Sequence, residues 1–183
     1  MLSNLSFSVS QSACLKDPTQ SELGRKILKE SINLLSDMGL EQFTFKKLAI
    51  EIGSTESSVY RYFENKHKLL VYLVNWYWSW LQNKILIKTY GNNSAFYKLE
   101  SSIELLASPI EQDDTYDYID QKKLYNIIIS EGAKVYLVKD VDAENSQGAY
   151  LAYKGLCAQL SDFILAINPK YKHSHTLAST IIE

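Results

Sequence analysis

Apolar residues recur at helical spacing between residues 44 and 53. They stand at i, i+3, i+4 and i+7, which is the period of one helix face: Phe45, Leu48, Ala49 and Ile52. Thr44 can cap this helix at its start, and Gly53 can end it in a left-handed turn. The pattern therefore predicts a short amphipathic helix with a defined start and end.

A second short helix is predicted directly after this turn. Thr55 can serve as its N-cap, and Val59, Tyr62 and Phe63 stand at i, i+3 and i+4 on one apolar face. Small Ala49 allows a close approach of the two helices. Two short helices joined by a tight glycine-containing turn are typical of a helix-turn-helix unit. An ordinary helical corner has the same spacing, so the spacing alone leaves both interpretations open.

The rest of the chain also favours helices. A capping box of Thr19 and Glu22 predicts a first helix that runs to about Met38 and ends at Gly39. Further helical periods are expected at 66–89, 94–107, 119–136, 143–167 and from 172 to the end. Because no pair of strands is indicated, we predict an all-α fold. Its N-terminal part is a three-helix unit that contains the helix-turn-helix, and a helical bundle follows.

Two of these helices have distinctive patterns. The stretch 66–89, with Asn65 as its N-cap, is apolar on nearly all sides, which predicts burial on most sides. The stretch 94–107 is amphipathic, and its apolar positions are Phe96, Leu99, Ile103 and Leu106. We expect three regions: a mobile arm over 1–18, a helix-turn-helix domain over 19–65, and a helical domain over 66–183.

Composition and charge are those of an ordinary soluble protein. Hydrophobic residues make up 46% of the 183 residues and charged residues 22%, with a net charge of -2. Only a local basic cluster suggests nucleic acid: Lys46, Lys47, Arg61, Lys66 and Lys68. Two distant cysteines, the lack of a convincing signal peptide and the lack of a membrane-spanning stretch favour a cytoplasmic protein.

No catalytic or metal-binding motif is found. His173 and His175 stand at i, i+2 without an accompanying cysteine or carboxylate cluster, which argues against a metal site. There is no phosphate-binding glycine loop, nucleophile elbow or HExxH. We therefore expect neither an enzyme nor a bound cofactor or metal.

The run GSTESSVYRYFENKHKLL, which contains the second predicted helix, resembles the DNA-binding signature of the tetracycline-repressor (TetR) family. The matching positions are Gly53, Tyr60, Tyr62, Phe63, Asn65, Lys66, Leu69 and Leu70. Thr44 and the pair Leu48–Ala49 also match the first motif helix of the family, and the specific resemblance covers about residues 21–75. It implies a ligand-responsive repressor that binds a palindromic DNA operator as a homodimer. The resemblance makes 19–65 the DNA-binding domain and 66–183 the effector-binding and dimerisation domain.

The candidate DNA-binding residues are Thr44, Lys46, Thr55, Glu56, Ser57, Ser58, Tyr60, Arg61, Tyr62 and Lys66. Ser57, Ser58 and Arg61 lie in the part of a recognition helix that meets base edges, and Arg61 suits a bidentate contact with guanine. The resemblance implies phosphate contacts for Thr44, Tyr60, Tyr62 and Lys66, although packing is an alternative role for both tyrosines.

Two positions depart from the family pattern. Ser54 stands where the family usually has valine, which weakens the small core between the two motif helices. Glu56 adds a carboxylate to the first turn of the recognition helix, where it can favour the helix dipole or accept from cytosine N4, but repels phosphate. Both positions favour the alternative of a helical small-molecule-binding protein that has lost specific DNA binding.

Candidate effector and dimer residues lie in the C-terminal region. A pocket for a small apolar or aromatic effector is expected from six aromatic residues: Trp76, Trp80, Tyr125, Tyr136, Tyr150 and Tyr153. An aromatic core is the alternative for each of them. A stripe of small residues and two residues of the last helix form the candidate dimer interface: Gly148, Ala152, Gly155, Leu177 and Ile181. Packing of the stripe inside one subunit is nearly as well supported.

Overall fold

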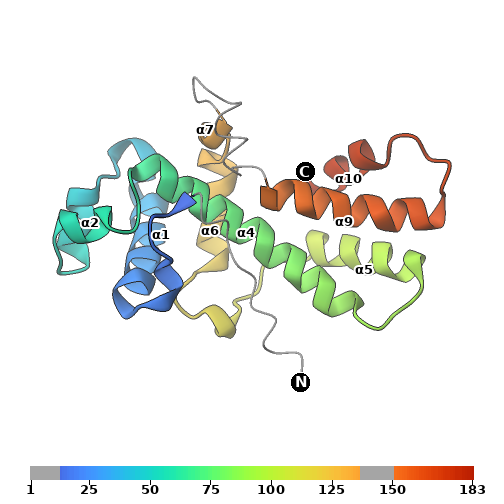
Figure 1. The fold of residues 1–183 in the computed structure, drawn as a ribbon, viewed down its shortest axis with the longest axis horizontal. Coiled ribbons are helices and arrows are strands. Elements are labelled where there is room, and N and C mark those ends of the chain that lie inside the picture. The colour runs from blue at the N-terminus through green and yellow to red at the C-terminus, as the bar shows by residue number, and fades with distance from the viewer. Residues whose placement is uncertain (1–12, 137–150) are drawn as a thin grey trace. The chain divides into compact units, whose positions relative to one another are not determined.

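The structure, a computed structural model, describes residues 13–136 and 151–183. Within these residues it contains helices and short 3-10 turns but no strand, which confirms the all-α prediction (Figure 1). The described residues divide into two compact units, which we call the head (13–77 and 110–136) and the tail (78–109 and 151–183). No helix in the described part of the chain is long and apolar enough to cross a membrane.

The head is built from the N-terminal helices and a later helix pair. Its helices are α1 (Glu22–Gln42), α2 (Phe45–Glu51), α3 (Glu56–Tyr60), the first part of α4 (Lys66–Thr89), α6 (Gln121–Glu131) and α7 (Ala133–Tyr136). Helix α6 packs against α1, and the Lys123 ammonium donates to Asn33 Oδ1 at 2.8 Å. The head core contains Ile27, Leu28 and Leu124 from these two helices.

Helix α1 starts later than the capping box predicts. Pro18–Gln20 form a 3-10 turn that is capped by the Asp17 carboxylate, and Ser21 caps α1 by accepting from the Gly24 N–H at 3.1 Å. Thr19 therefore is not the N-cap of α1. Pro18 fixes the backbone for a tight turn, which moves the helix start to Glu22.

The predicted end of α1 is a break inside the helix. Gly39 has φ 72° and ψ 170°, so it leaves the helical conformation as predicted. The chain then makes one further turn to Gln42, and the Phe43 N–H donates to the Gly39 carbonyl at 3.2 Å. This extra turn leads directly into Thr44 and α2.

Residues 13–18 are packed against the head. Ala13 is buried, the Leu15 N–H donates to the Tyr62 carbonyl at 2.8 Å, and the Lys16 ammonium lies 5.2 Å from the centre of the Tyr62 ring. These contacts place this segment in the head rather than in an arm. Residues 1–12 of the predicted arm lie outside the described residues.

The tail consists of the second part of α4 together with α5 (Ala95–Ala107), α9 (Leu151–Ile167) and α10 (Ser174–Ile182). Helix α9 packs against both α5 and α10 (Figure 1). Helix α4 has the predicted bounds, and Asn65 accepts from the Lys68 N–H at 2.9 Å, as expected of its N-cap. The predicted start of α9, at 143–150, lies outside the described residues.

Helix α5 does not bury the side that its sequence pattern marks as apolar. Phe96 is 65% exposed and Ile103 is 41% exposed, whereas Ser101 and Ser102 are buried. The Ser102 hydroxyl donates to the Lys98 carbonyl at 2.6 Å, so its burial leaves no donor without an acceptor. Small serines allow a close approach of α5 to its neighbours, and this packing overrides the apolar pattern.

Candidate DNA-binding site

Helices α2 and α3 form the helix-turn-helix unit with the predicted caps. Thr44 caps α2 by accepting from the Lys47 N–H at 3.2 Å, and Thr55 caps α3 by accepting from the Ser58 N–H at 3.3 Å. Between them Gly53 has φ 64°, a left-handed conformation that favours glycine. The Ser54 N–H donates to the Ala49 carbonyl at 2.9 Å and closes the turn. The two helices are therefore held in a fixed relation by their caps and turn.

The angle between α2 and α3 is filled by apolar side chains. Leu48, Val59 and Phe63 are fully buried, and Ala49 and Ile52 are nearly so. Ser54 is only half-buried, so the hydroxyl at this position lies at the edge of the small core. The serine thus removes some apolar contact without placing an unpaired hydroxyl inside.

One side of α3 faces solvent. Glu56, Ser57, Tyr60 and Arg61 are exposed along it, while Val59 points into the head. Ser58 is half-buried, where its hydroxyl lies 3.0 Å from the Thr55 hydroxyl and accepts from the Arg61 guanidinium at 3.3 Å. We call these four exposed residues the reading face. It carries an acid at its start and a guanidinium at its end.

The two tyrosines of the motif differ. Tyr60 is 48% exposed, and its ring packs edge-on against Phe45 with centroids 5.0 Å apart, so its hydroxyl end can reach a phosphate. Tyr62 is 3% exposed, and its hydroxyl lies 2.8 Å from the Ser21 hydroxyl. Tyr62 therefore anchors the start of α1 to the motif, which is the packing role.

Lys66 and Lys47 bind the end of α1. The Lys66 ammonium donates to the carbonyls of Leu40, Glu41 and Phe43 at 2.8, 3.1 and 3.2 Å, which uses all three of its protons. The Lys47 ammonium donates to the Gln42 carbonyl at 2.8 Å. In this arrangement Lys66 caps a helix C-terminus, where a cation is favourable.

These contacts reduce the positive charge available for DNA. Of the predicted basic cluster, Lys46, Lys47 and Arg61 are exposed, and of these three Lys47 donates to a main-chain carbonyl within the described residues. Thr44 is exposed too, and its hydroxyl proton is not used by the cap, because the cap uses the oxygen as an acceptor. The candidate phosphate contacts are thus Thr44, Lys46 and Tyr60.

The predicted effector residues are divided between the two units. Trp76 and Tyr125 belong to the head, and Trp76 is buried with its ring edge-on to Tyr116 at 5.3 Å. Trp80 and Tyr153 belong to the tail, where the Tyr153 hydroxyl lies 2.9 Å from the Ser179 hydroxyl. Core packing accounts for both tryptophans.

The other two predicted effector residues are Tyr150 and Tyr136. Tyr150 lies outside the described residues, and of Tyr136 the structure places the backbone, as the last residue of α7.

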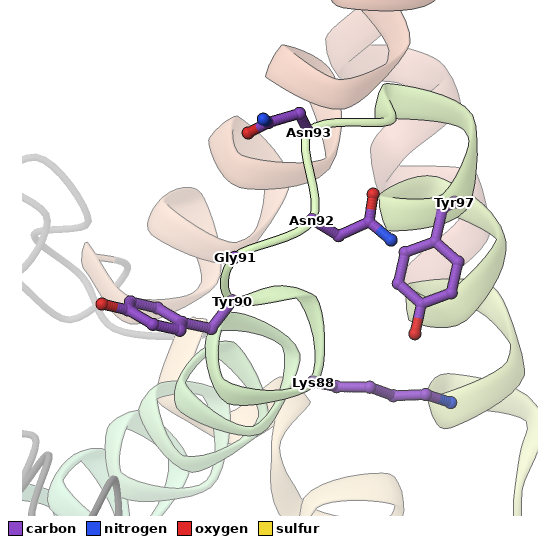
Figure 2. A pocket seen from close by; sticks show the side chains of 6 residues that line it. All are labelled: Lys88, Tyr90, Gly91, Asn92, Asn93 and Tyr97. Carbon is purple, nitrogen blue, oxygen red and sulfur yellow. The ribbon is translucent and has the colours of Figure 1, made fainter.

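A concavity is present at another place, the turn from α4 to α5 (Figure 2). It is lined by Lys88, Tyr90, Gly91, Asn92, Asn93 and Tyr97. In Figure 2 the Lys88 and Tyr97 side chains extend along the same side of the turn, while Tyr90 points away from them. The concavity is open and polar, and it contains none of the predicted effector residues.

The small-residue stripe on α9 packs within the chain at Gly155. A Cβ added there would lie 3.1 Å from Oε1 of Gln82 on α4, so the close approach is between α9 and α4 of the tail. This supports packing inside one subunit for Gly155. Ala152, Leu177 and Ile181 are half-buried, and Gly148 lies outside the described residues.

The capped helix pair, its glycine turn and an exposed polar face on the second helix define a helix-turn-helix DNA-binding protein. Residues 27–73 match the family model of the bacterial regulatory proteins of the tetR family. The DNA-binding region of the chain therefore belongs to this family, as its motif residues predict. No curated protein matches the chain in sequence.

Two similar solved structures have the same fold. Apo AibR has a TM-score of 0.57 and 15% identity, over 86% of this chain and 80% of AibR. AibR in complex with isovaleryl coenzyme A and operator DNA has a TM-score of 0.61 and 15% identity, over 86% of this chain and 82% of AibR. The similarity extends well beyond the matched DNA-binding region, so the tail belongs to the shared fold.

Proposed function

We propose that this chain is a ligand-responsive transcriptional repressor that binds a near-palindromic operator as a homodimer. The observation that carries the proposal is the reading face of α3, held by two caps and a buried core beside the exposed Thr44 and Lys46. A recognition helix needs this combination, because its backbone must be rigid while its polar side chains reach base edges. Binding to operator DNA places the protein in the cytoplasm.

Base readout is assigned to the reading face. Arg61 offers the bidentate geometry that suits guanine, and Ser57 offers a hydroxyl that accepts or donates. Glu56 suits the amino group of cytosine and repels phosphate, which penalises DNA without a well-placed cytosine. Sequence preference in this protein therefore depends more on base contacts than on attraction to the backbone.

The salt dependence of binding tests this balance. Lys46 and Arg61 are the two cations of each head that are assigned to DNA, so a dimer brings about four positive charges to the duplex, and the slope of log K against log salt is expected near about -4. A slope near zero would favour the alternative function, a small-molecule-binding protein of the same fold without specific DNA binding. The internal use of Lys47 and Lys66 is the observation that favours this alternative.

A dimer is proposed through α9 and α10. Two recognition helices of a palindrome reader lie about 34 Å apart, which one chain cannot provide. Leu177 and Ile181 of α10 are half-buried, so they are free to bury further area against a second copy. Light scattering at micromolar concentration should give the mass of a dimer, and a monomer under these conditions would contradict the proposal.

The effector is proposed to be a small molecule: either an apolar or aromatic compound, as the aromatic residues of the chain suggest, or an acyl-coenzyme A, by analogy with the ligand in the AibR complex. A ligand switches such a protein only if it binds the state that does not bind DNA more tightly than the other state. Acyl-coenzyme A compounds and planar aromatic compounds should be screened by melting temperature and tryptophan fluorescence. A binder that leaves the DNA affinity unchanged would contradict the regulatory role.

The direct test of DNA recognition is selection of bound duplexes from a random library with the full chain. The proposal predicts enrichment of a near-palindromic motif whose half-sites are about one helical turn apart. Recovery of unenriched sequence would contradict it. Bases that Arg61 and Glu56 contact should appear as guanine and cytosine at fixed positions in each half-site.

A further inference from the structure

The break in α1 frees both main-chain groups of one residue. Gly39 leaves the helical conformation, so the main-chain hydrogen bonds of α1 are interrupted there. The Leu40 N–H and the Leu40 carbonyl therefore bind groups from other elements. Leu40 is buried, so neither group can rely on water. Both groups need partners from within the protein.

Charged side chains from two different helices supply these partners. The Glu131 carboxylate, at the end of α6, accepts from the Leu40 N–H at 3.2 Å through Oε1. The Lys66 ammonium, at the start of α4, donates to the Leu40 carbonyl at 2.8 Å. The last turn of α1 is thus held from one side by α6 and from the other by α4. These residues are 91 and 26 positions from Leu40 in sequence.

The Glu131 carboxylate is itself fixed in place. The residue is buried, and its second oxygen, Oε2, lies 2.7 Å from the Lys134 ammonium on α7. Oε1 lies close to Gly39 as well, since a Cβ added at that glycine would come within 3.0 Å of it. A side chain at position 39 would compete with the carboxylate for this space. The glycine therefore allows both the break and the approach of Glu131.

The carboxylate is held in its charged form. Burial by itself raises the pKa of Glu131, but hydrogen bonds from Lys134 and the Leu40 N–H, together with the Lys134 charge, outweigh burial and lower the pKa below its ordinary value. A charged acceptor makes a stronger hydrogen bond to a main-chain N–H than a neutral one. The contact with Leu40 is therefore of the stronger kind.

We infer that Glu131 is a positioning residue for DNA binding: by holding the Leu40 N–H it fixes the last turn of α1 and so the entry of the chain into α2. This inference rests on the proposed function. The turn it holds leads through Phe43, which is fully buried, to Thr44, the cap of α2 and a candidate phosphate contact. A shift of this turn moves the helix-turn-helix unit relative to α6.

Two variants of Glu131 separate the hydrogen bond from the charge. Glu131→Ala removes the acceptor, while Glu131→Gln keeps an amide oxygen for the Leu40 N–H but loses the ion pair with Lys134. With the full chain, we expect Glu131→Ala to speed amide exchange of the Leu40 N–H at least about tenfold and to weaken binding to a library-selected duplex about tenfold. Glu131→Gln should restore most of both.

Controls distinguish positioning from general stability. Lys134→Ala removes the ion pair alone and should change DNA affinity little, and Glu104→Ala in the tail, which loses a surface ion pair with Lys88, should change nothing. Affinities are compared at a temperature where every variant is folded by circular dichroism. If Glu131→Ala does not fold, Glu131→Asp makes the same test, because its shorter side chain withdraws the carboxylate from Leu40.

The outcomes are distinct. A folded Glu131→Ala variant with a lower melting temperature but wild-type DNA affinity would overturn the positioning role, as would unchanged exchange at Leu40. A DNA affinity of Glu131→Gln as low as that of Glu131→Ala would also overturn the positioning role. A wild-type chain without sequence preference would instead overturn the proposed function. In that case, the rate of amide exchange at Leu40 alone would test whether Glu131 holds the last turn of α1.

Discussion

The head and the tail of this protein use their apolar residues in opposite ways. In the head, the stripe of α2 and the apolar face of α3 are buried, and Phe63 has no exposed surface. In the tail, Phe96 of α5 is 65% exposed, while serines of the same helix are buried. In the head, the spacing of apolar residues along the chain decides which side of a helix is buried. In α5 of the tail, this spacing does not decide it.

The largest expected effect separates these two phenylalanines. Phe63→Ala should lower the free energy of unfolding by about 3–5 kcal/mol, since it removes a buried ring that packs against Tyr72. Phe96→Ala should change it by less than about 0.5 kcal/mol, because most of that ring is in water. Urea unfolding followed by circular dichroism checks both. Equal losses would remove the contrast between head and tail.

Gly39 and Gly91, two of the three glycines with positive φ in the described residues, form the next pair. Gly39→Ala should cost of order 1–3 kcal/mol, because its φ and ψ are accessible almost only to glycine and its Cβ would approach the Glu131 carboxylate. Gly91→Ala, in the tail, has open space around its Cβ and should cost only the conformational part, about 1 kcal/mol. The same urea titration measures the difference. A larger loss at Gly91 would contradict the role of Glu131.

Gly155→Leu tests how the tail is packed. The leucine side chain would enter the space of Gln82 on α4, and we expect a loss of about 1–3 kcal/mol in the free energy of unfolding. Light scattering of the folded variant should give the wild-type mass, because Gly155 faces its own chain. A change of mass without a loss of stability would indicate that Gly155 lies at the dimer interface instead.

The smallest effect concerns pH. The pKa of Glu131 is lowered in the folded chain, so its stabilising contribution is complete above the ordinary value of 4.5 and is lost as the pH falls through the lower folded value. The difference in urea midpoint between wild type and Glu131→Gln should therefore shrink at acid pH. The charged groups that interact with this site are Lys134, the ion-pair partner of Glu131, and Glu41, which acts on Lys134 through its charge. A difference that grows in acid would contradict the assignment.

The helix-turn-helix unit could be predicted because its signals are local. The caps Thr44 and Thr55, the turn at Gly53 and the apolar positions of α2 and α3 all lie within twenty residues, and each depends on neighbours along the chain. The reading face followed from the same spacing. Helix α4 was predicted with its bounds for a similar reason, since Asn65 supplies a local cap.

The roles of Lys66 and Gly155 could not be predicted, because they depend on distant partners. Lys66 binds carbonyls that are released by a break in α1, and no local pattern shows that a helix end will lie there. Gly155 faces Gln82, 73 positions earlier in the chain. The contact of Glu131 with Leu40 left no sequence signal except a glutamate within an otherwise apolar helix period.

The central claim, that α3 reads DNA sequence, is tested most directly by Arg61→Ala. Its affinity should be measured against a library-selected duplex and a random duplex at one salt concentration, beside wild type. The reading face predicts a loss of about 1–3 kcal/mol on the selected duplex, confined to one base position, and a much smaller loss on random DNA. Equal losses on the two duplexes would show that Arg61 contacts only the backbone, and would contradict sequence reading by α3.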